Sequence, residues 1–102
     1  MSQIGCIDAA TEIIGTKWSA HIVRVLASGP KRYRDIESGI AGINPRILCQ
    51  RLDMLAKHQI VTETDKRYEL TPKGRDLLPI IEKMADWGDK HPSRQAASGV
   101  LV

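Results

Sequence analysis

The chain has 102 residues, of which 42% are hydrophobic and 26% charged. This composition fits one folded domain and excludes a disordered chain. The formal net charge of +3 is unevenly spread, since residues 16–75 hold 12 Lys and Arg against six Asp and Glu, and the rest hold three against six. A basic middle section is typical of a surface that faces phosphate, although an ordinary solvated surface has the same composition.

The sequence also argues against several other classes. Nowhere do 18 apolar residues follow one another, and the N-terminus has no basic region followed by a long apolar run. We therefore expect a soluble, cytoplasmic protein without membrane association. The two cysteines, Cys6 and Cys49, predict neither a disulfide framework nor a metal site, and we expect no cofactor.

Two helices are expected at the start. Apolar residues at helical spacing predict a short first helix over residues 7–15, which needs a packing partner. A second helix is expected over residues 17–28, with Trp18 and Ile22 on its core face, and Gly29 followed by proline ends it.

A helix-turn-helix pattern follows. A basic stretch over residues 31–34 leads into a short helix through Ile40, then a glycine-bearing turn over residues 39–43, then a longer helix over residues 43–58. This order of short helix, turn and amphipathic helix is that of a helix-turn-helix, although bland helical pairs share it.

The helix over residues 43–58 has the clearest signals in the chain. Asn44 is a preferred N-cap, and Pro45 stands at the first helical position, where its missing N–H costs nothing. Leucines at helical period form one apolar stripe, at Leu48, Leu52 and Leu55. The opposite face presents Arg46 and Gln50, and Arg and Gln are the usual readers of guanine and adenine edges. The alternative for this helix is a polar face that is merely solvated.

A hairpin and a final helix complete the prediction. Residues 60–64 and 67–71 alternate as strands do, with Asp65-Lys66 between them, so we expect a small β-hairpin whose tip carries Lys66 and Arg67. A last helix is expected from Thr71 to about Asp89, kinked at Pro79.

In fold class, the prediction is mainly α with a small β-hairpin: a winged helix-turn-helix with N- and C-terminal dimerisation helices. We assign residues 1–92 to this one domain and residues 93–102 to a flexible C-terminal tail.

The order of the motifs resembles that of the HxlR-type winged helix-turn-helix regulators, a family within the MarR-like superfamily. The resemblance covers about residues 6 to 90. It rests on Cys6, Gly15-Thr16-Lys17-Trp18, Gly29-Pro30-Lys31-Arg32-Tyr33-Arg34-Asp35-Ile36, Ile43-Asn44-Pro45-Arg46-Ile47-Leu48, Gln50-Arg51-Leu52, Tyr68-Glu69-Leu70-Thr71, Gly74, Leu77 and Trp87. The chain departs from the family pattern at Ile7, where proline is frequent, and in its shorter wing over residues 63–67.

The resemblance implies a transcriptional regulator that binds a palindromic operator in double-stranded DNA as a homodimer. Base reading is expected of Arg46 and Gln50, with Asn44, Pro45 and Cys49 close by. Phosphate contacts are expected of Lys31, Arg32, Arg34, Arg51, Lys66 and Arg67, and Arg51 has the alternative of a structural brace. The dimer interface is expected to comprise Ile7, Ile14, Leu78, Ile81, Met84 and Trp87, and the alternative is that the last helix only covers the core of its own chain.

The resemblance further implies a sensing residue. Several members of the family detect oxidants or electrophiles through an N-terminal cysteine, and Cys6 stands where a helix N-terminus would stabilise its thiolate, although Asp8 opposes this. Cys49 is a second candidate, and both cysteines have the alternative of an inert thiol. The sequence identifies no small-molecule inducer and does not decide between repressor and activator.

Two other classes of protein fit the sequence less well than a DNA-binding protein. An enzyme is not expected, because the histidines at positions 21, 58 and 91 show no metal-ligand spacing and no glycine-rich phosphate loop occurs. The alternative is a winged helix that binds protein without specific DNA binding, against which the basic middle section argues.

Overall fold

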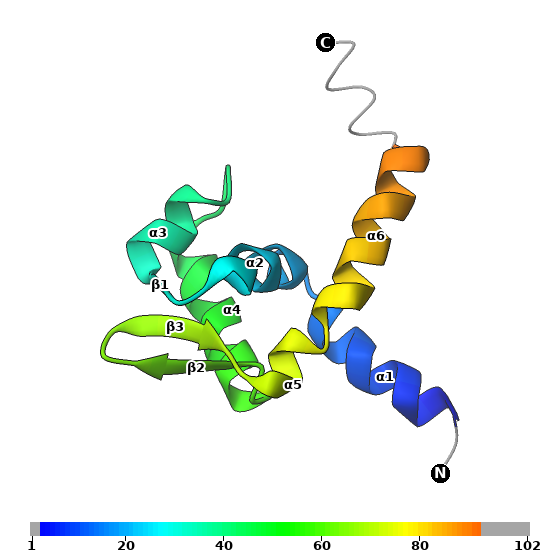
Figure 1. The fold of residues 1–102 in the computed structure, drawn as a ribbon, viewed down its shortest axis with the longest axis horizontal. Helices are drawn as coiled ribbons and strands as arrows, with labels where there is room; N and C mark the ends of the chain where they lie inside the picture. Colours follow the sequence, from blue (N-terminus) through cyan, green and yellow to red (C-terminus); the bar gives the residue numbers. More distant parts are fainter. Residues whose placement is uncertain (1–2, 93–102) are drawn as a thin grey trace.

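The computed structural model describes residues 3–92 and confirms a mainly helical fold with a small antiparallel sheet (Figure 1). The helices are α1 Gln3–Ile14, α2 Ser19–Val25, the 3₁₀ helix η1 Leu26–Ser28, α3 Tyr33–Ser38, α4 Pro45–Lys57, α5 Pro72–Arg75 and α6 Leu78–Lys90. The strands are β1 Lys31–Arg32, β2 Val61–Thr64 and β3 Arg67–Leu70. None of these helices has the length and apolar content to span a membrane. The predicted tail, residues 93–102, lies outside the described residues.

The core is aliphatic, as the composition predicts. Its buried side chains come from every part of the described chain: Ile13, Ile22, Val23, Leu26, Ile36, Ile40, Ile43, Leu48, Leu52, Leu55, Ile60, Val61, Leu70, Leu77 and Ile81. Aromatic side chains pack only at its edge, because Trp18, Tyr33 and Tyr68 are partly buried. Burial of such aliphatic side chains contributes roughly 1.5–3 kcal/mol each, which makes the core the main source of stability.

Helix α4 begins and packs as its sequence predicts. Asn44 is the N-cap, and its Oδ1 accepts hydrogen bonds from the backbone N–H of Arg46 at 2.7 Å and of Ile47 at 3.4 Å. The three leucines of the stripe are buried at 0–3% exposure. The capped start and the buried stripe together fix which face of α4 is turned outward.

The predicted hairpin is present, but it belongs to a three-stranded sheet with the order β1-β3-β2. The two-residue strand β1 pairs with β3, which places Lys31 opposite Tyr68 and Arg32 opposite Arg67. Sequence periodicity missed β1 because two residues are too short to show alternation. The added strand joins the start of the helix-turn-helix to the hairpin.

Helix α1 begins earlier than predicted. Its first residue is Gln3, so Cys6 lies within the helix, not just before it. The favourable effect of a helix N-terminus on an anion falls off within the first turn. Cys6 is the fourth residue of α1, at the end of its first turn, and stabilisation of its thiolate by the helix N-terminus stays a prediction.

The predicted last helix is two helices. Helix α5 ends at Arg75 and α6 starts at Leu78, with Leu77 as the α6 N-cap. Pro79 therefore lies in the first turn of α6, where a missing N–H is tolerated, and does not kink a continuous helix. At Gly74 a Cβ atom would lie only 2.2 Å from the Ile60 carbonyl oxygen, so this close contact of α5 requires glycine.

The hairpin turn generates a prediction about stability. Asp65 and Lys66 both have positive φ, at 55° and 65°, which is the backbone of a type I′ turn. Since a side chain is disfavoured there, Lys66→Gly is expected to raise the free energy of unfolding by roughly 0.5–1 kcal/mol, measured by urea unfolding. Lys66→Ala is the matched control, because it removes the same charge and keeps the Cβ. An equal gain in both variants would contradict this explanation.

Candidate nucleic-acid interface

The outward face of α4 carries the predicted base-reading residues. Arg46, Cys49, Gln50 and Asp53 are exposed, and the described part of the chain does not cover them. Their spacing of three to four residues places them on one side of the helix, opposite the leucine stripe. The helix therefore presents a guanidinium and a carboxamide from its first two turns, with a thiol between them.

The start of α4 is held by the preceding helix. The Tyr33 hydroxyl, in the first turn of α3, donates a hydrogen bond to the Pro45 carbonyl oxygen at 2.8 Å. This bond crosses the glycine-bearing turn of the helix-turn-helix. It fixes the position from which Asn44 and Arg46 project.

Cations gather where β1, α3 and the hairpin tip meet. Arg32, Arg34, Lys66 and Arg67 are exposed, and Lys31 is half-buried. Arg32, Arg34 and Lys66 line a surface depression together with Tyr33 and Asp35. The two arginines at 32 and 67 are direct cross-strand partners, an arrangement that destabilises a sheet unless an anion lies between the charges.

These cations form no ion pair with any of the described residues. The one ion pair there joins Arg24 on α2 to Glu82 on α6, at 3.2 Å, and involves no residue of the basic cluster. The guanidiniums and the ammonium beside the hairpin therefore lack a carboxylate within ion-pair distance. Such a surface suits a polyanion.

Arg51 on α4 is bonded to a backbone carbonyl far away in the sequence. It is half-buried, and its Nε donates a hydrogen bond to the Lys17 carbonyl oxygen at 2.8 Å. A bond of this kind fits the structural alternative for Arg51, and a phosphate contact by its terminal nitrogens stays a prediction.

The thiol of Cys49 lies beside two tyrosines. Burial raises the pKa of Tyr33 above its ordinary value, and the neighbouring Cys49 side chain raises it further. Burial also raises the pKa of Tyr68, with a smaller contribution from the Glu63 carboxylate. Both tyrosines thus stay neutral at physiological pH, and the Tyr33 hydroxyl keeps the proton it donates to Pro45.

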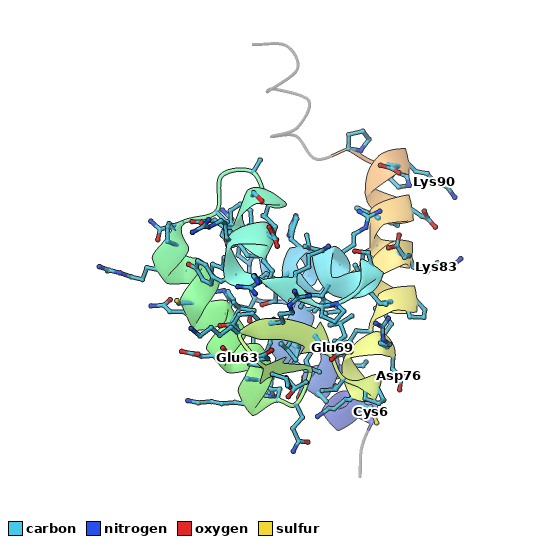
Figure 2. The ribbon with its side chains drawn as sticks, turned by 60° about the vertical axis from the view of Figure 1, so that its left-hand side comes forward. Cys6, Glu63, Glu69, Asp76, Lys83 and Lys90 are labelled. Carbon is cyan, nitrogen blue, oxygen red and sulfur yellow. The ribbon has the colours of Figure 1, made fainter. Side chains whose placement is uncertain are left out.

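Cys6 lies in a separate region. It is exposed on α1, and Figure 2 shows it near the outer end of that helix. A modification at Cys6 would therefore act on α1 first and would reach α4 only through the rest of the fold. Within the described residues no group of three or more His, Cys, Asp and Glu side chains could hold a metal ion.

The predicted dimer residues divide into two groups. Ile7, Met84 and Trp87 are exposed at 65%, 44% and 66%, so they are available to a partner surface, and Ile14 and Leu78 are half-buried. Ile81 is buried at 4% exposure in the chain's own core, and its assignment to a dimer interface is corrected. Helices α1 and α6 lie on one side of the molecule, and α3 and the hairpin on the other (Figure 1).

A helix-turn-helix with a β-hairpin wing, an outward recognition face and an adjacent basic cluster defines a winged helix-turn-helix DNA-binding protein. The comparison with known families agrees, because the HxlR-like helix-turn-helix family matches residues 13–96. The chain belongs to this family, and it is a DNA-binding transcriptional regulator.

Individual relatives support the assignment. The HTH-type transcriptional regulator YodB of Bacillus subtilis is 32% identical over 91 residues, which cover 82% of this chain and 81% of YodB. The crystal structure of quinone-bound YodB has a TM-score of 0.77 at 32% identity and covers 84% of this chain and 98% of that one. The redox regulator HypR in its reduced form has a TM-score of 0.71 at 27% identity, over 82% of this chain and 90% of HypR.

The raised pKa values of Tyr33 and Tyr68 predict how stability depends on pH. Because the pKa of each is raised on folding, the folded state keeps a proton that the unfolded chain has lost. Their contribution to stability is therefore full below about pH 10, the ordinary tyrosine pKa, and is lost as the pH rises through the folded pKa.

Ultraviolet difference absorbance of tyrosinate measures the pH at which each tyrosine ionises. In the folded protein both tyrosines are expected to ionise above the ordinary value, and Tyr33→Phe is expected to remove one of the two transitions. A transition of either tyrosine at the ordinary pKa in the folded protein would contradict the buried setting described above.

Proposed function

We propose that the chain binds an inverted-repeat operator as a homodimer, with the α4 helices of two copies in successive major grooves. Arg46 and Gln50 read base edges, supported by Asn44, Pro45 and Cys49. Lys31, Arg32, Arg34, Lys66 and Arg67 contact phosphates. One observation carries the proposal: the capped α4 leaves Arg46 and Gln50 exposed beside a cluster of cations that form no ion pair within residues 6–92.

The proposed dimer is supported by apolar exposure on α1 and α6. Ile7, Ile80, Met84 and Trp87 together expose large apolar side chains on the side of the molecule away from α3 and the hairpin. Such a surface marks an interaction site. A two-fold axis there would leave both recognition helices facing outward, as a palindromic operator requires.

We further propose that the protein acts as a cytoplasmic repressor that leaves DNA when Cys6 reacts with an oxidant or an electrophile. Two observations support this: Cys6 is exposed on α1, and the chain is similar to YodB, whose structure holds a quinone, and to the redox regulator HypR. Cys6 lies on α1, which is part of the proposed dimer surface. An adduct on its thiol would therefore change the distance between the α4 helices of the two copies.

Selection of bound duplexes from a random DNA pool tests the function as a whole. An inverted repeat is the expected product, and its half-site spacing measures the separation of the two α4 helices. The selection is repeated after treatment with a thiol oxidant, when a loss of bound DNA is expected. Binding that ignores sequence, or that is absent at low ionic strength, would overturn the proposal and leave a protein-binding winged helix.

Arg46→Ala is expected to weaken binding to the selected operator by roughly 1–3 kcal/mol and to weaken binding to random DNA far less, because a base contact is lost. Fluorescence anisotropy on both duplexes measures the difference. Arg67→Ala is the control, since loss of a phosphate contact weakens both complexes alike. Equal losses for Arg46→Ala on the two duplexes would show that Arg46 does not read bases.

Cys6→Ser is expected to abolish oxidant-triggered release from the operator and to leave affinity under reducing conditions unchanged. Cys49→Ser serves as the matched control, and release is expected to persist in it. The sensing role of Cys6 would have to be abandoned if Cys6→Ser still left DNA on oxidation as the unaltered protein does.

A further inference from the structure

Helix α4 is attached to a distant part of the chain by one side chain. The Arg51 Nε donates to the Lys17 carbonyl oxygen at 2.8 Å, across 34 positions of sequence. Lys17 lies in the turn, residues 15–18, that joins α1 to α2. The recognition helix is thus linked directly to the junction of the first two helices.

This junction turn has an unfavourable conformation. Trp18 has a φ of 79°, in the left-handed region that bulky side chains avoid. The next residue, Ser19, is fully buried, and its hydroxyl has no hydrogen-bond partner. Two such costs at adjacent residues persist only where surrounding contacts determine the backbone strongly.

The contacts that hold the turn come from both sides. From α1, the Thr11 carbonyl accepts from the Gly15 N–H at 2.8 Å, and the Thr16 hydroxyl donates to the Glu12 carbonyl at 3.1 Å. The Lys17 ammonium lies 5.2 Å from the centre of the Trp18 ring. Arg51 supplies the bond from the α4 side, so the turn is fixed between α1 and the recognition helix.

Arg51 also complements the contact at the start of α4. The Tyr33 hydroxyl holds the Pro45 carbonyl, and Arg51 holds the helix nearly two turns later. The buried leucines fix which face of α4 is turned outward, and these two hydrogen bonds hold the helix axis at two points along its length. Arg51 projects about 140° around the helix from Arg46, at 100° per residue, and so lies away from the base-reading face.

From this geometry we infer that Arg51 is a positioning residue for operator reading. It holds α4 at the angle at which Arg46 and Gln50 reach base edges, through its Nε–H and the Lys17 carbonyl and not through a phosphate. This inference rests on the proposed function. It states that the α1–α2 junction helps to set the orientation of the recognition helix α4.

Two substitutions separate the hydrogen bond from the charge. In Arg51→Gln the amide nitrogen stands the same number of bonds from Cα as the Arg Nε, so the donor is kept and the charge is lost. In Arg51→Lys a methylene occupies that place, so the charge is kept and the donor is lost there. Operator affinity is expected to fall about tenfold in Arg51→Lys and less than about threefold in Arg51→Gln, as loss of one hydrogen bond from a charged group predicts.

The salt dependence gives the second readout. A phosphate contact contributes about 0.9 to the slope of log affinity against log salt concentration. Arg51→Gln is expected to retain the slope of the unaltered protein. Arg67→Gln and Arg67→Lys, in the wing, are the matched pair. Arg67→Gln is expected to reduce both the slope and the affinity, whereas Arg67→Lys is expected to keep both. If the Arg51 pair follows the Arg67 pattern, Arg51 contacts phosphate and the inference is overturned.

A measurement without DNA keeps this test separate from the proposed function. Amide hydrogen exchange of Ser19 and Ile22, whose N–H groups donate to Thr16 and Trp18 carbonyls, reports on the junction turn. Exchange is expected to accelerate at least severalfold in Arg51→Lys and to stay unchanged in Arg51→Gln. Unchanged exchange in both variants would overturn the role of Arg51 in holding the junction, whatever DNA the protein binds.

Discussion

The packing of three leucines decides the orientation of the functional surface. Leu48, Leu52 and Leu55 are almost completely removed from solvent, and burial of each contributes roughly 1.5–3 kcal/mol. The Asn44 cap is worth about 1 kcal/mol, so it sets where the helix begins and does not set how the helix faces. Because side chains on a helix have fixed angular spacing, burial of the leucines forces Arg46 and Gln50 outward. The face proposed to read DNA is therefore a consequence of core packing.

The basic cluster, unlike the leucine core, disfavours the folded state. Arg32 and Arg67 face each other across β1 and β3, where like charges are unfavourable, and the single ion pair within residues 6–92 lies elsewhere, between α2 and α6. A carboxylate at one of these positions would stabilise the sheet more than a second cation does. Two cations there fit a surface whose counter-charge is a nucleic acid backbone. The core thus stabilises the fold, and the basic cluster serves association with DNA.

The strained junction between α1 and α2 links the two sides of the molecule. Helix α1 carries Cys6 and part of the exposed apolar surface, and the junction is bonded to α4 through Arg51. A displacement of α1 therefore has a short path to the recognition helix, through Thr16 and the Lys17 carbonyl. This path offers a physical connection between chemistry at Cys6 and the spacing of two recognition helices.

By itself the sequence determined the features that depend on nearby residues. These are the cap at Asn44, the period of the leucine stripe, the strands around Asp65 and the aliphatic core, because capping and periodicity are local. Features that depend on distant partners became visible in the folded chain alone. Strand β1 exists because β3 lies beside it, Arg51 is hydrogen-bonded because the Lys17 carbonyl is within reach, and Ile81 is core because α6 packs on α2. In each case the deciding partner is more than 30 residues away in sequence, where no local pattern could indicate it.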